Sequence, residues 1–182
     1  QRLAVANDGT AAATVAASTA IYLADGAGRR TGRPVATLRL GSASIAPGAT
    51  ATLTGSGDVA RPKLWGPPPT QTPNLYVAVT TLTRDGRAVD TDETKFGIRT
   101  VVADGTSGLI VNGERVPIRG VNNHHDLGAL GAAFNVRAAE RQLEIMREMG
   151  ANAIRMSHNP PAAELLDLAD RMGFLVIDEV FD

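Results

Sequence analysis

Three short segments in the C-terminal half of the chain carry side chains suited to chemistry on a polar substrate. They hold imidazole, guanidinium, hydroxyl and carboxylate groups: His124, His125 and Asp126; Arg155, Ser157 and His158; Asp178 and Glu179. All three histidines of the chain lie in these segments, so the chemistry that titrates near neutral pH is concentrated there. Where such segments meet, their groups can bind a polar substrate through hydrogen bonds and stabilise developing charge.

The stretches that precede these segments predict consecutive strands of a parallel sheet. They cover residues 119–124, 151–156 and 174–177, and helical patterns separate them in a β-α-β-α-β order. The continuous apolar run at residues 174–177 is typical of a strand buried on both faces. The carboxyl ends of parallel strands meet at one edge, which is the active-site side of parallel α/β folds, so we expect the three segments to lie together there.

Two amphipathic helices are predicted between these strands. The first begins after Asn135, which suits an N-cap, and ends at Gly150, which suits a left-handed terminator. Pro160 and Pro161 are predicted to open the second helix, which ends at Gly173. Apolar residues recur at helical spacing: Ala139, Leu143 and Met146 in the first helix, and Leu165, Leu166, Ala169 and Met172 in the second.

Residues 1–100 predict an antiparallel β-sandwich of short strands. Turn residues separate β-branched or apolar runs at residues 3–6, 35–40, 51–54, 75–82 and 87–90. Asp85-Gly86, and Asn112-Gly113 further along, predict hairpin turns that need positive φ angles. Nothing in residues 1–100 converges chemically, so we expect a scaffold without a site.

Composition bounds the class of protein. The 182 residues are 43% hydrophobic and 20% charged, which is typical of a globular chain and argues against disorder or a membrane span. The net charge of −1 provides no global attraction for nucleic acid or an anionic membrane. Residues 1–100 carry 11 basic and 7 acidic side chains, whereas residues 101–182 carry 7 and 12, so we expect two domains with these bounds. Both chain ends look cut, which suggests a fragment of a longer protein.

Several side chains leave alternatives open. The chain lacks cysteine, which excludes a thiolate metal site, and His124 and His125 do not easily reach one ion because neighbours on a strand point to opposite faces. We therefore expect no metal, and the role of His125 stays open. Asp178 and Glu179 are expected to pair with Arg155 and orient the site rather than act as general acids. Trp65 beside a proline run is expected to be a packing anchor rather than a stacking platform for a sugar.

Seven stretches match one known pattern in order and spacing. They are Leu64-Trp65, Leu75-Tyr76, Phe96-Gly97-Ile98-Arg99, Asn112-Gly113, Arg119-Gly120-Val121-Asn122-Asn123-His124, Ala153-Ile154-Arg155-Met156-Ser157-His158-Asn159-Pro160 and Val176-Ile177-Asp178-Glu179. Together they resemble glycoside hydrolase family 2, the group of β-galactosidases and β-glucuronidases. The resemblance implies a mixed fold, an immunoglobulin-like antiparallel β-sandwich followed by an incomplete (β/α)8 TIM barrel of about three strands and two helices.

The resemblance also implies roles for individual residues. His124 and His158 match histidines that line the sugar subsite, and Arg155 matches the arginine near the nucleophile, so these three are expected to bind substrate. Four further residues match positions that support the pocket: Asn123, Ser157, Asp178 and Glu179. No cofactor is implied.

The leading hypothesis is a fragment of a retaining β-glycosidase, β-galactosidase-like, whose parent hydrolyses terminal β-linked sugars. The catalytic glutamates of the family follow later strands, so we predict that this chain alone has no turnover. A non-catalytic carbohydrate-binding or interaction module is an alternative from another class, and a β-glucuronidase or β-mannosidase parent is another. We also expect an exposed apolar barrel interior and an unpaired edge at residues 174–180, through which the chain self-associates.

Overall fold

The protein is described here by a computed structural model that covers residues 1–180, and these residues form two compact units. The first unit contains Gln1–Pro62 and Tyr76–Phe96, and the second contains Lys63–Leu75 and the residues from Gly97 onward. The chain therefore crosses between the units more than once, and the segment Lys63–Leu75 packs with the C-terminal half. Among residues 1–180, the helices lack the length and the apolar composition that a membrane-spanning helix needs.

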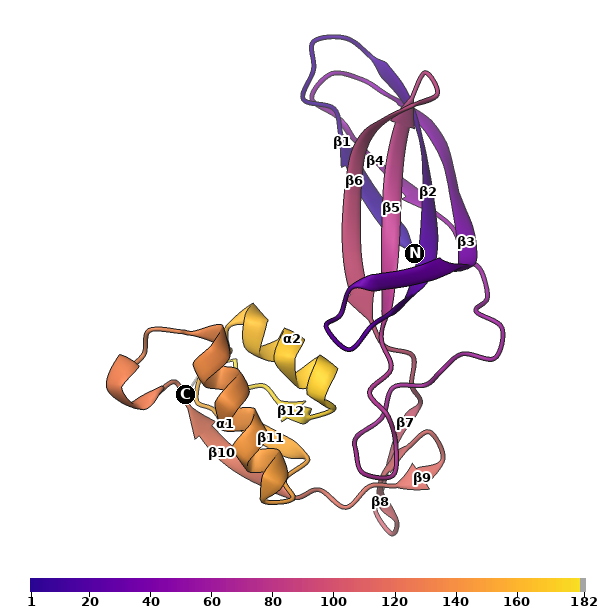
Figure 1. Ribbon diagram of the computed structural model, residues 1–182. Coiled ribbons are helices and arrows are strands. Elements are labelled where there is room, and N and C mark those ends of the chain that lie inside the picture. Colours follow the sequence, from indigo (N-terminus) through magenta and orange to yellow (C-terminus); the bar gives the residue numbers. More distant parts are fainter. Residues whose placement is uncertain (181–182) are drawn as a thin grey trace. The chain divides into compact units, whose positions relative to one another are not determined.

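The first unit contains two antiparallel sheets. The long strands of the larger sheet run side by side in Figure 1. Its strands are β1 (Arg2–Ala6), β2 (Ala13–Ala24), β3 (Arg30–Ile45), β4 (Thr50–Thr54), β5 (Tyr76–Arg84) and β6 (Arg87–Phe96). Strands β1 and β4 form one sheet, and the other has the order β3-β2-β5-β6. A buried hydrogen bond of 2.9 Å joins the hydroxyl groups of Thr19 and Thr80, which are paired residues of β2 and β5.

The sequence pattern predicts most of these strands but not β2. Strand β2 is rich in alanine, which favours strands only weakly, yet its alternate residues Val15, Ala17, Thr19 and Ile21 are buried. The run predicted at residues 35–40 is too short, because β3 extends from Arg30 to Ile45 and continues through a β-bulge at Gly41, which has a φ of 88°. The predicted turn between β5 and β6 is confirmed.

The second unit combines a small antiparallel sheet with a parallel sheet and its helices. The antiparallel strands are β7 (Val101–Asp104), β8 (Gly108–Val111) and β9 (Glu114–Arg115). The remaining elements are β10 (Gly120–His124), the short 3-10 helix η1 (Gly128–Leu130), α1 (Val136–Glu148), β11 (Ala153–Ser157), α2 (Ala163–Met172) and β12 (Leu175–Ile177). Strands β10, β11 and β12 are parallel and adjacent in that order, so the predicted β-α-β-α-β arrangement is present.

Local signals mark the start of α1 and the end of α2. The side chain of Asn135 accepts a 3.0 Å hydrogen bond from the backbone N–H of Ala138, which confirms the predicted N-cap of α1. Gly173 ends α2 in the left-handed conformation, as predicted. Helix α2 begins at Ala163 rather than at the two prolines, and its fully buried leucine beside Leu165 is Leu168 instead of Leu166.

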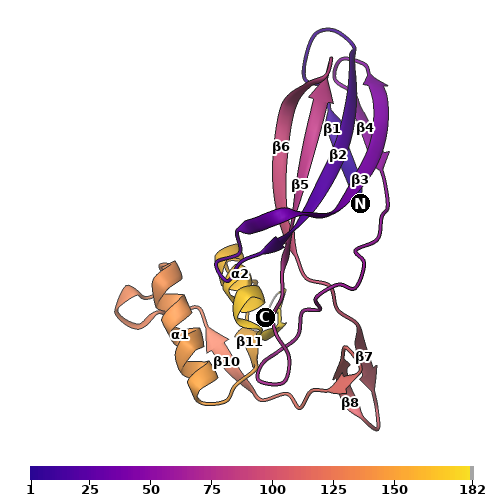
Figure 2. The same cartoon turned by 45° about the vertical axis from the view of Figure 1, so that its right-hand side comes forward.

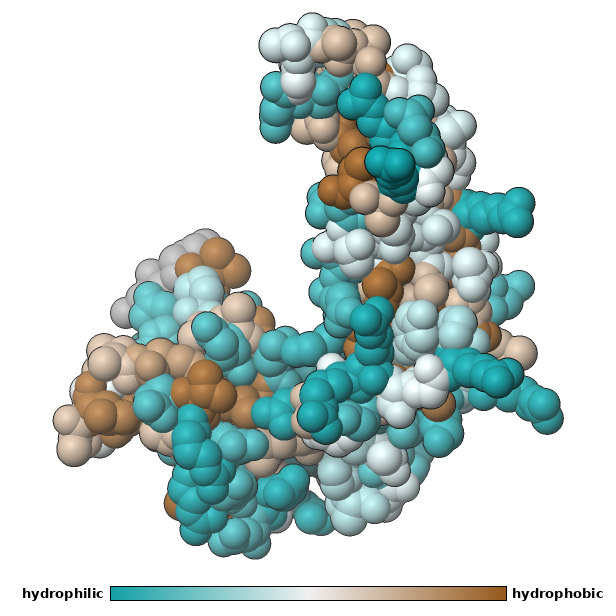
Figure 3. Space-filling model, turned by 45° about the horizontal axis from the view of Figure 1, so that its top comes forward, coloured by the Kyte–Doolittle hydropathy of each residue, from teal (hydrophilic) through white to brown (hydrophobic). Residues whose placement is uncertain are grey.

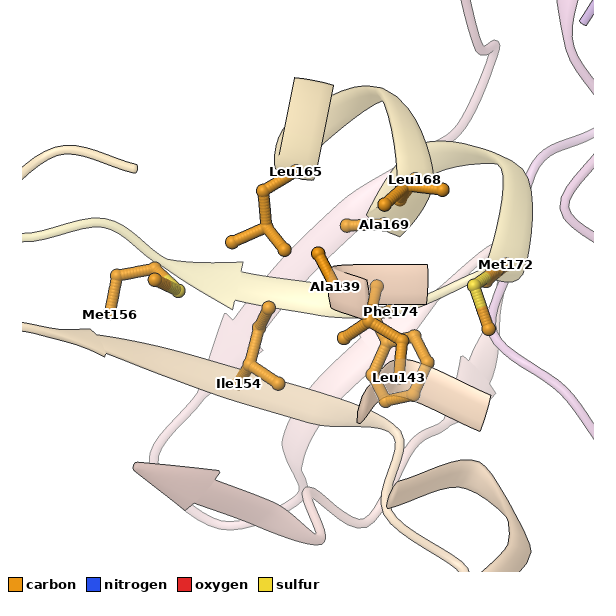
Figure 4. Close-up of a cluster of buried hydrophobic side chains, with 9 residues drawn as sticks. All are labelled: Ala139, Leu143, Ile154, Met156, Leu165, Leu168, Ala169, Met172 and Phe174. Atoms are coloured by element: carbon orange, nitrogen blue, oxygen red, sulfur yellow. The ribbon is translucent and has the colours of Figure 1, made fainter. Parts of the chain in front are cut away.

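Both helices pack on the same face of the parallel sheet. Figure 2 shows α1 and α2 side by side, and Figure 4 shows their buried side chains gathered with Ile154 and Met156 of β11. The cluster consists of Ala139, Leu143, Ile154, Met156, Leu165, Leu168, Ala169, Met172 and Phe174. Because neighbours on a strand point to opposite faces, burial of Ile154 and Met156 sends Arg155 and Ser157 to the other face of the sheet.

The face of the sheet opposite the helices is more polar than the sequence predicts. The strand register places Asn122 and Ile177 beside Arg155, and His124 beside Ser157. Residues 174–180 are predicted to be exposed. This prediction is wrong for Phe174, which is buried with the helices. Ile177 and Val180 are 55% and 73% exposed.

Trp65 anchors the segment Lys63–Leu75 within the second unit. Its ring is buried, and its indole N–H donates a 2.8 Å hydrogen bond to the backbone carbonyl of Asp170 in α2. The guanidinium of Arg99 lies over the ring at 4.5 Å from the centroid. The prediction of a packing anchor is therefore confirmed, and the buried ring is not a platform for a sugar.

Asn112 joins three stretches of the second unit. Its amide nitrogen donates hydrogen bonds to the Trp65 carbonyl (2.9 Å) and to Oε1 of Gln71 (2.8 Å), and its side-chain oxygen accepts one from the backbone N–H of Thr100 (3.0 Å). Asn112 and Gly113 have φ angles of 55° and 81°, which confirms the predicted turn between β8 and β9.

We expect Asn112→Gly to destabilise the second unit by about 3 kcal/mol, at roughly 1 kcal/mol for each lost hydrogen bond. Glycine keeps the positive φ angle, so the loss reports the side-chain contacts. The measurement is urea unfolding of the 182-residue chain followed by the fluorescence of Trp65, the only tryptophan. Asp85→Gly is the matched control, because Asp85 has a similar φ of 51° in an exposed turn and should change stability little. Equal effects of the two substitutions would contradict the prediction.

Candidate functional site

The three predicted segments meet at the carboxyl end of the parallel sheet. Strand β10 ends at His124, which pairs with Ser157, the last residue of β11. Arg155 lies between Asn122 of β10 and Ile177 of β12 in the register. His158 and Glu179 follow β11 and β12 directly, so the topology brings groups from three strands to one edge.

Glu179 connects two of the predicted substrate-binding residues. Its Oε1 forms an ion pair with the guanidinium of Arg155, and its Oε2 lies 2.9 Å from Nδ1 of His158. The Glu179 side chain is 20% exposed, whereas those of Arg155 and His158 are 39% and 40% exposed. The carboxylate is thus largely covered, while the two groups that it holds remain accessible to a ligand.

The third predicted binding residue, His124, contacts the same cluster. The rings of His124 and His158 have centroids 5.5 Å apart and meet edge to face at 79°. Arg155 also approaches Oγ of Ser157 at 3.4 Å and Oδ1 of Asn122 at 3.5 Å, both long hydrogen bonds. His124, Arg155, Ser157, His158 and Glu179 therefore form one connected group, which we call the strand-end cluster.

The electrostatics of the strand-end cluster favour an ionised Glu179. Burial raises the pKa of its carboxyl group, but hydrogen bonds from His158 and Arg155 and the charge of Arg155 outweigh this effect. The pKa of Glu179 therefore lies below its ordinary value of 4.5. Because both oxygens are engaged, Glu179 is suited to orienting its partners rather than to donating a proton.

Four predicted residues lie outside the strand-end cluster. Asn123, His125 and Asp126 line a cavity of about 230 Å³, together with His124 of the cluster and apolar residues of both helices. Asp178 is exposed and forms no hydrogen bond or ion pair with the described residues, so the expected pairing with Arg155 is present for Glu179 and not for Asp178.

Asn122 contacts the cluster although sequence reasoning selected its neighbour Asn123. In a strand, residues two apart share a face, and Asn122 is two residues from His124. That alternation was the available signal, because Asn123 is paired with Met156, which faces the helices. Among residues 1–180, no three histidine or acidic side chains are grouped so as to hold a metal ion.

Because its pKa is lowered in the folded state, ionised Glu179 should stabilise the protein above pH 4.5 and lose this effect as the pH falls through the lowered pKa. We expect Glu179→Gln to be less stable than the unmodified chain at pH 7, and the difference to shrink below pH 4.5. Urea midpoints from Trp65 fluorescence across pH 3 to 7 measure this. Asp178→Asn, which removes an uncontacted carboxylate, should behave like the unmodified chain, and a Glu179→Gln difference independent of pH would count against the ion pair.

Comparison with protein families covers nearly the whole chain. Residues 2–99 match the model described as "Glycosyl hydrolases family 2", and residues 102–181 match "Glycosyl hydrolases family 2, TIM barrel domain". The predicted fold class is confirmed, since the chain contains an immunoglobulin-like sandwich followed by part of a TIM barrel.

Individual relatives agree with these matches. The β-galactosidase BoGH2A of Bacteroides ovatus is 54% identical over 124 residues, which are 68% of this chain and 14% of that protein. A putative β-glucuronidase of Formosa agariphila is 39% identical over 125 residues, or 69% of this chain and 12% of that protein.

Solved structures show the same likeness. A glycosyl hydrolase family 2 member from Bacteroides cellulosilyticus superposes with a TM-score of 0.86 at 32% identity, covering 98% of this chain and 23% of that one. A β-glucuronidase of Bacteroides uniformis, covalently bound to cyclophellitol-6-carboxylate aziridine, gives a TM-score of 0.83 at 31% identity over 98% of this chain and 20% of that one. The chain thus spans less than a quarter of the length of these relatives. From its sandwich to its third parallel strand, the chain belongs to glycosyl hydrolase family 2.

Proposed function

We propose that the chain supplies the sandwich and the first part of the barrel of a β-glycosidase that releases terminal β-linked sugars. The observation that carries the proposal is the strand-end cluster. It gathers His124, Arg155 and His158 at the carboxyl end of parallel strands, which is where TIM-barrel enzymes hold their active sites. Two imidazoles and a guanidinium, all partly accessible, suit the hydroxyl groups of a sugar.

A β-galactoside is the proposed substrate class. It is favoured by the 54% identity to the β-galactosidase of Bacteroides ovatus. A β-glucuronide is the second candidate, because several relatives are named β-glucuronidases, including one of Bacteroides fragilis at 33% identity. Asn123 and Asp178, which lie outside the strand-end cluster, are proposed to support the pocket less directly than Ser157 and Glu179.

The proposed mechanism is retaining and needs two carboxyl groups. One protonates the leaving group and the other attacks the anomeric carbon, with the two groups about 5–5.5 Å apart. Glu179 has both oxygens engaged, so we assign it neither role. The described residues provide three parallel strands of a fold that closes with eight, and we propose that the catalytic pair comes from other strands and that this chain alone has no turnover.

A chimaeric enzyme tests this proposal. The matching 124 residues of this chain replace their counterparts in the Bacteroides ovatus β-galactosidase, and release of nitrophenol from the β-galactoside, β-glucuronide and β-mannoside is measured. We expect the chimaera to cleave the galactoside and the 182-residue chain to cleave nothing. His158→Ala in the chimaera should lower kcat/KM about tenfold or more, because a hydrogen bond worth about 1.5 kcal/mol corresponds to that factor.

His125→Ala is the matched control, since no hydrogen bond, ion pair or ring contact joins His125 to the strand-end cluster, and we expect a much smaller loss of activity than for His158→Ala. A folded chimaera without hydrolysis would favour a non-catalytic carbohydrate-binding module. Saturable hydrolysis by the 182-residue chain would overturn the proposed lack of turnover.

We also propose that the 182-residue chain self-associates through β12. Among the described strands, β12 pairs only with β11, and Ile177 and Val180 are exposed beside its free edge. On the face visible in Figure 3, brown hydrophobic residues form separate patches among hydrophilic ones.

Sedimentation velocity at tens of micromolar should show a species heavier than the monomer. Ile177→Lys should restore the monomer, because a charge at the edge opposes strand pairing. Val89→Lys is the control, since Val89 of β6 is equally exposed at 55%. A monomer at all concentrations, or equal effects of both substitutions, would refute association through β12.

A further inference from the structure

The hydrogen bond between Glu179 and His158 determines which ring nitrogen carries the proton. Nδ1 of His158 lies 2.9 Å from Oε2 of Glu179. We infer that Glu179 is a positioning residue that holds His158 as the Nδ1–H tautomer and leaves Nε2 as a hydrogen-bond acceptor for a substrate hydroxyl group. The identity of that hydroxyl as part of a sugar rests on the proposed function, whereas the tautomer does not.

The charge on Glu179 sets the direction of this hydrogen bond. Its other oxygen is paired with Arg155, and a guanidinium stays protonated at every pH that a folded protein experiences. An ionised carboxylate has no proton and can only accept hydrogen bonds. The short contact with His158 therefore requires a proton on Nδ1, and in the neutral ring Nε2 then has none.

The surroundings of His158 hold this arrangement in place from three strands. Arg155 of β11 is itself steadied by contacts with Ser157 and Asn122, so the carboxylate is fixed at its other end. His124 of β10 meets the ring of His158 edge to face. The ring of His158 thus contacts a histidine from β10. The carboxylate that it bonds is itself held by an arginine from β11. Both contacts restrict the rotation of the His158 ring.

This tautomer determines which ligand groups can form a hydrogen bond with Nε2 of His158. An unprotonated Nε2 accepts from a hydroxyl group but cannot donate to a carbonyl or carboxylate oxygen. The 40% exposure of the side chain leaves room for such a contact. While its ring is neutral, His158 would therefore recognise a hydroxyl group, and a ligand that offers only anionic oxygens at this point would lose the hydrogen bond.

Two-bond ¹H–¹⁵N spectra of the uniformly labelled 182-residue chain test the inference directly. They are recorded at alkaline pH, above the range in which imidazoles titrate, and His158→Gln assigns the signals. We expect the Nδ1–H form to exceed the Nε2–H form by about tenfold or more, the factor typical of a hydrogen bond to a charged group. A predominant Nε2–H pattern in the unmodified chain would overturn the inference.

Two variants test whether Glu179 causes the tautomer preference. Glu179→Ala should release the preference so that both tautomers are seen, whereas Asp178→Asn removes a neighbouring carboxylate without contact to His158 and should leave the spectrum unchanged. Persistence of the Nδ1–H form in Glu179→Ala would also contradict the role of Glu179. No substrate is used, so an inactive chimaera and a wrong tautomer are separate outcomes.

Discussion

The alternation of side chains along β11 is the constraint on which the site depends. Ile154 and Met156 must face the two helices, because they are almost completely buried in the cluster that joins α1 and α2 to the sheet. Arg155 and Ser157 consequently face the other way. A shift of the strand by one residue would place a guanidinium among the leucines, and the free-energy cost of burying an unpaired charge excludes that register.

The same constraint explains why a charged residue is tolerated in the middle of a central strand. Arg155 has a carboxylate partner in Glu179 and two further polar neighbours, so its charge is compensated on the polar face of the sheet. Glu179 follows β12 directly, and its position therefore depends on the parallel pairing of β12 with β11. Packing on one face of the sheet and ion pairing on the other thus support a single register.

The sequence allowed the parallel strands, both helices and the meeting of the three polar segments to be predicted, because apolar periodicity and the cap residues Asn135 and Gly173 are local signals. It did not reveal β2, whose alanines favour a strand only through burial against its neighbours. The family motif predicts Asn123 as a supporting residue. The alternation of side chains along β10 instead favours Asn122, which shares a face with His124. The contact of Glu179 rather than Asp178 with His158 depends on the path of the chain after β12, which no local pattern encodes.

Lys63–Leu75 has a consequence for recombination between related genes. This stretch comes between two strands of the sandwich in sequence, yet its tryptophan is hydrogen-bonded to α2 more than a hundred positions later. A single crossover between the two units would pair an indole from one ancestor with a helix from another. Exchange of the complete second unit therefore requires additional breakpoints on both sides of Lys63–Leu75. A single breakpoint would not transfer the second unit intact.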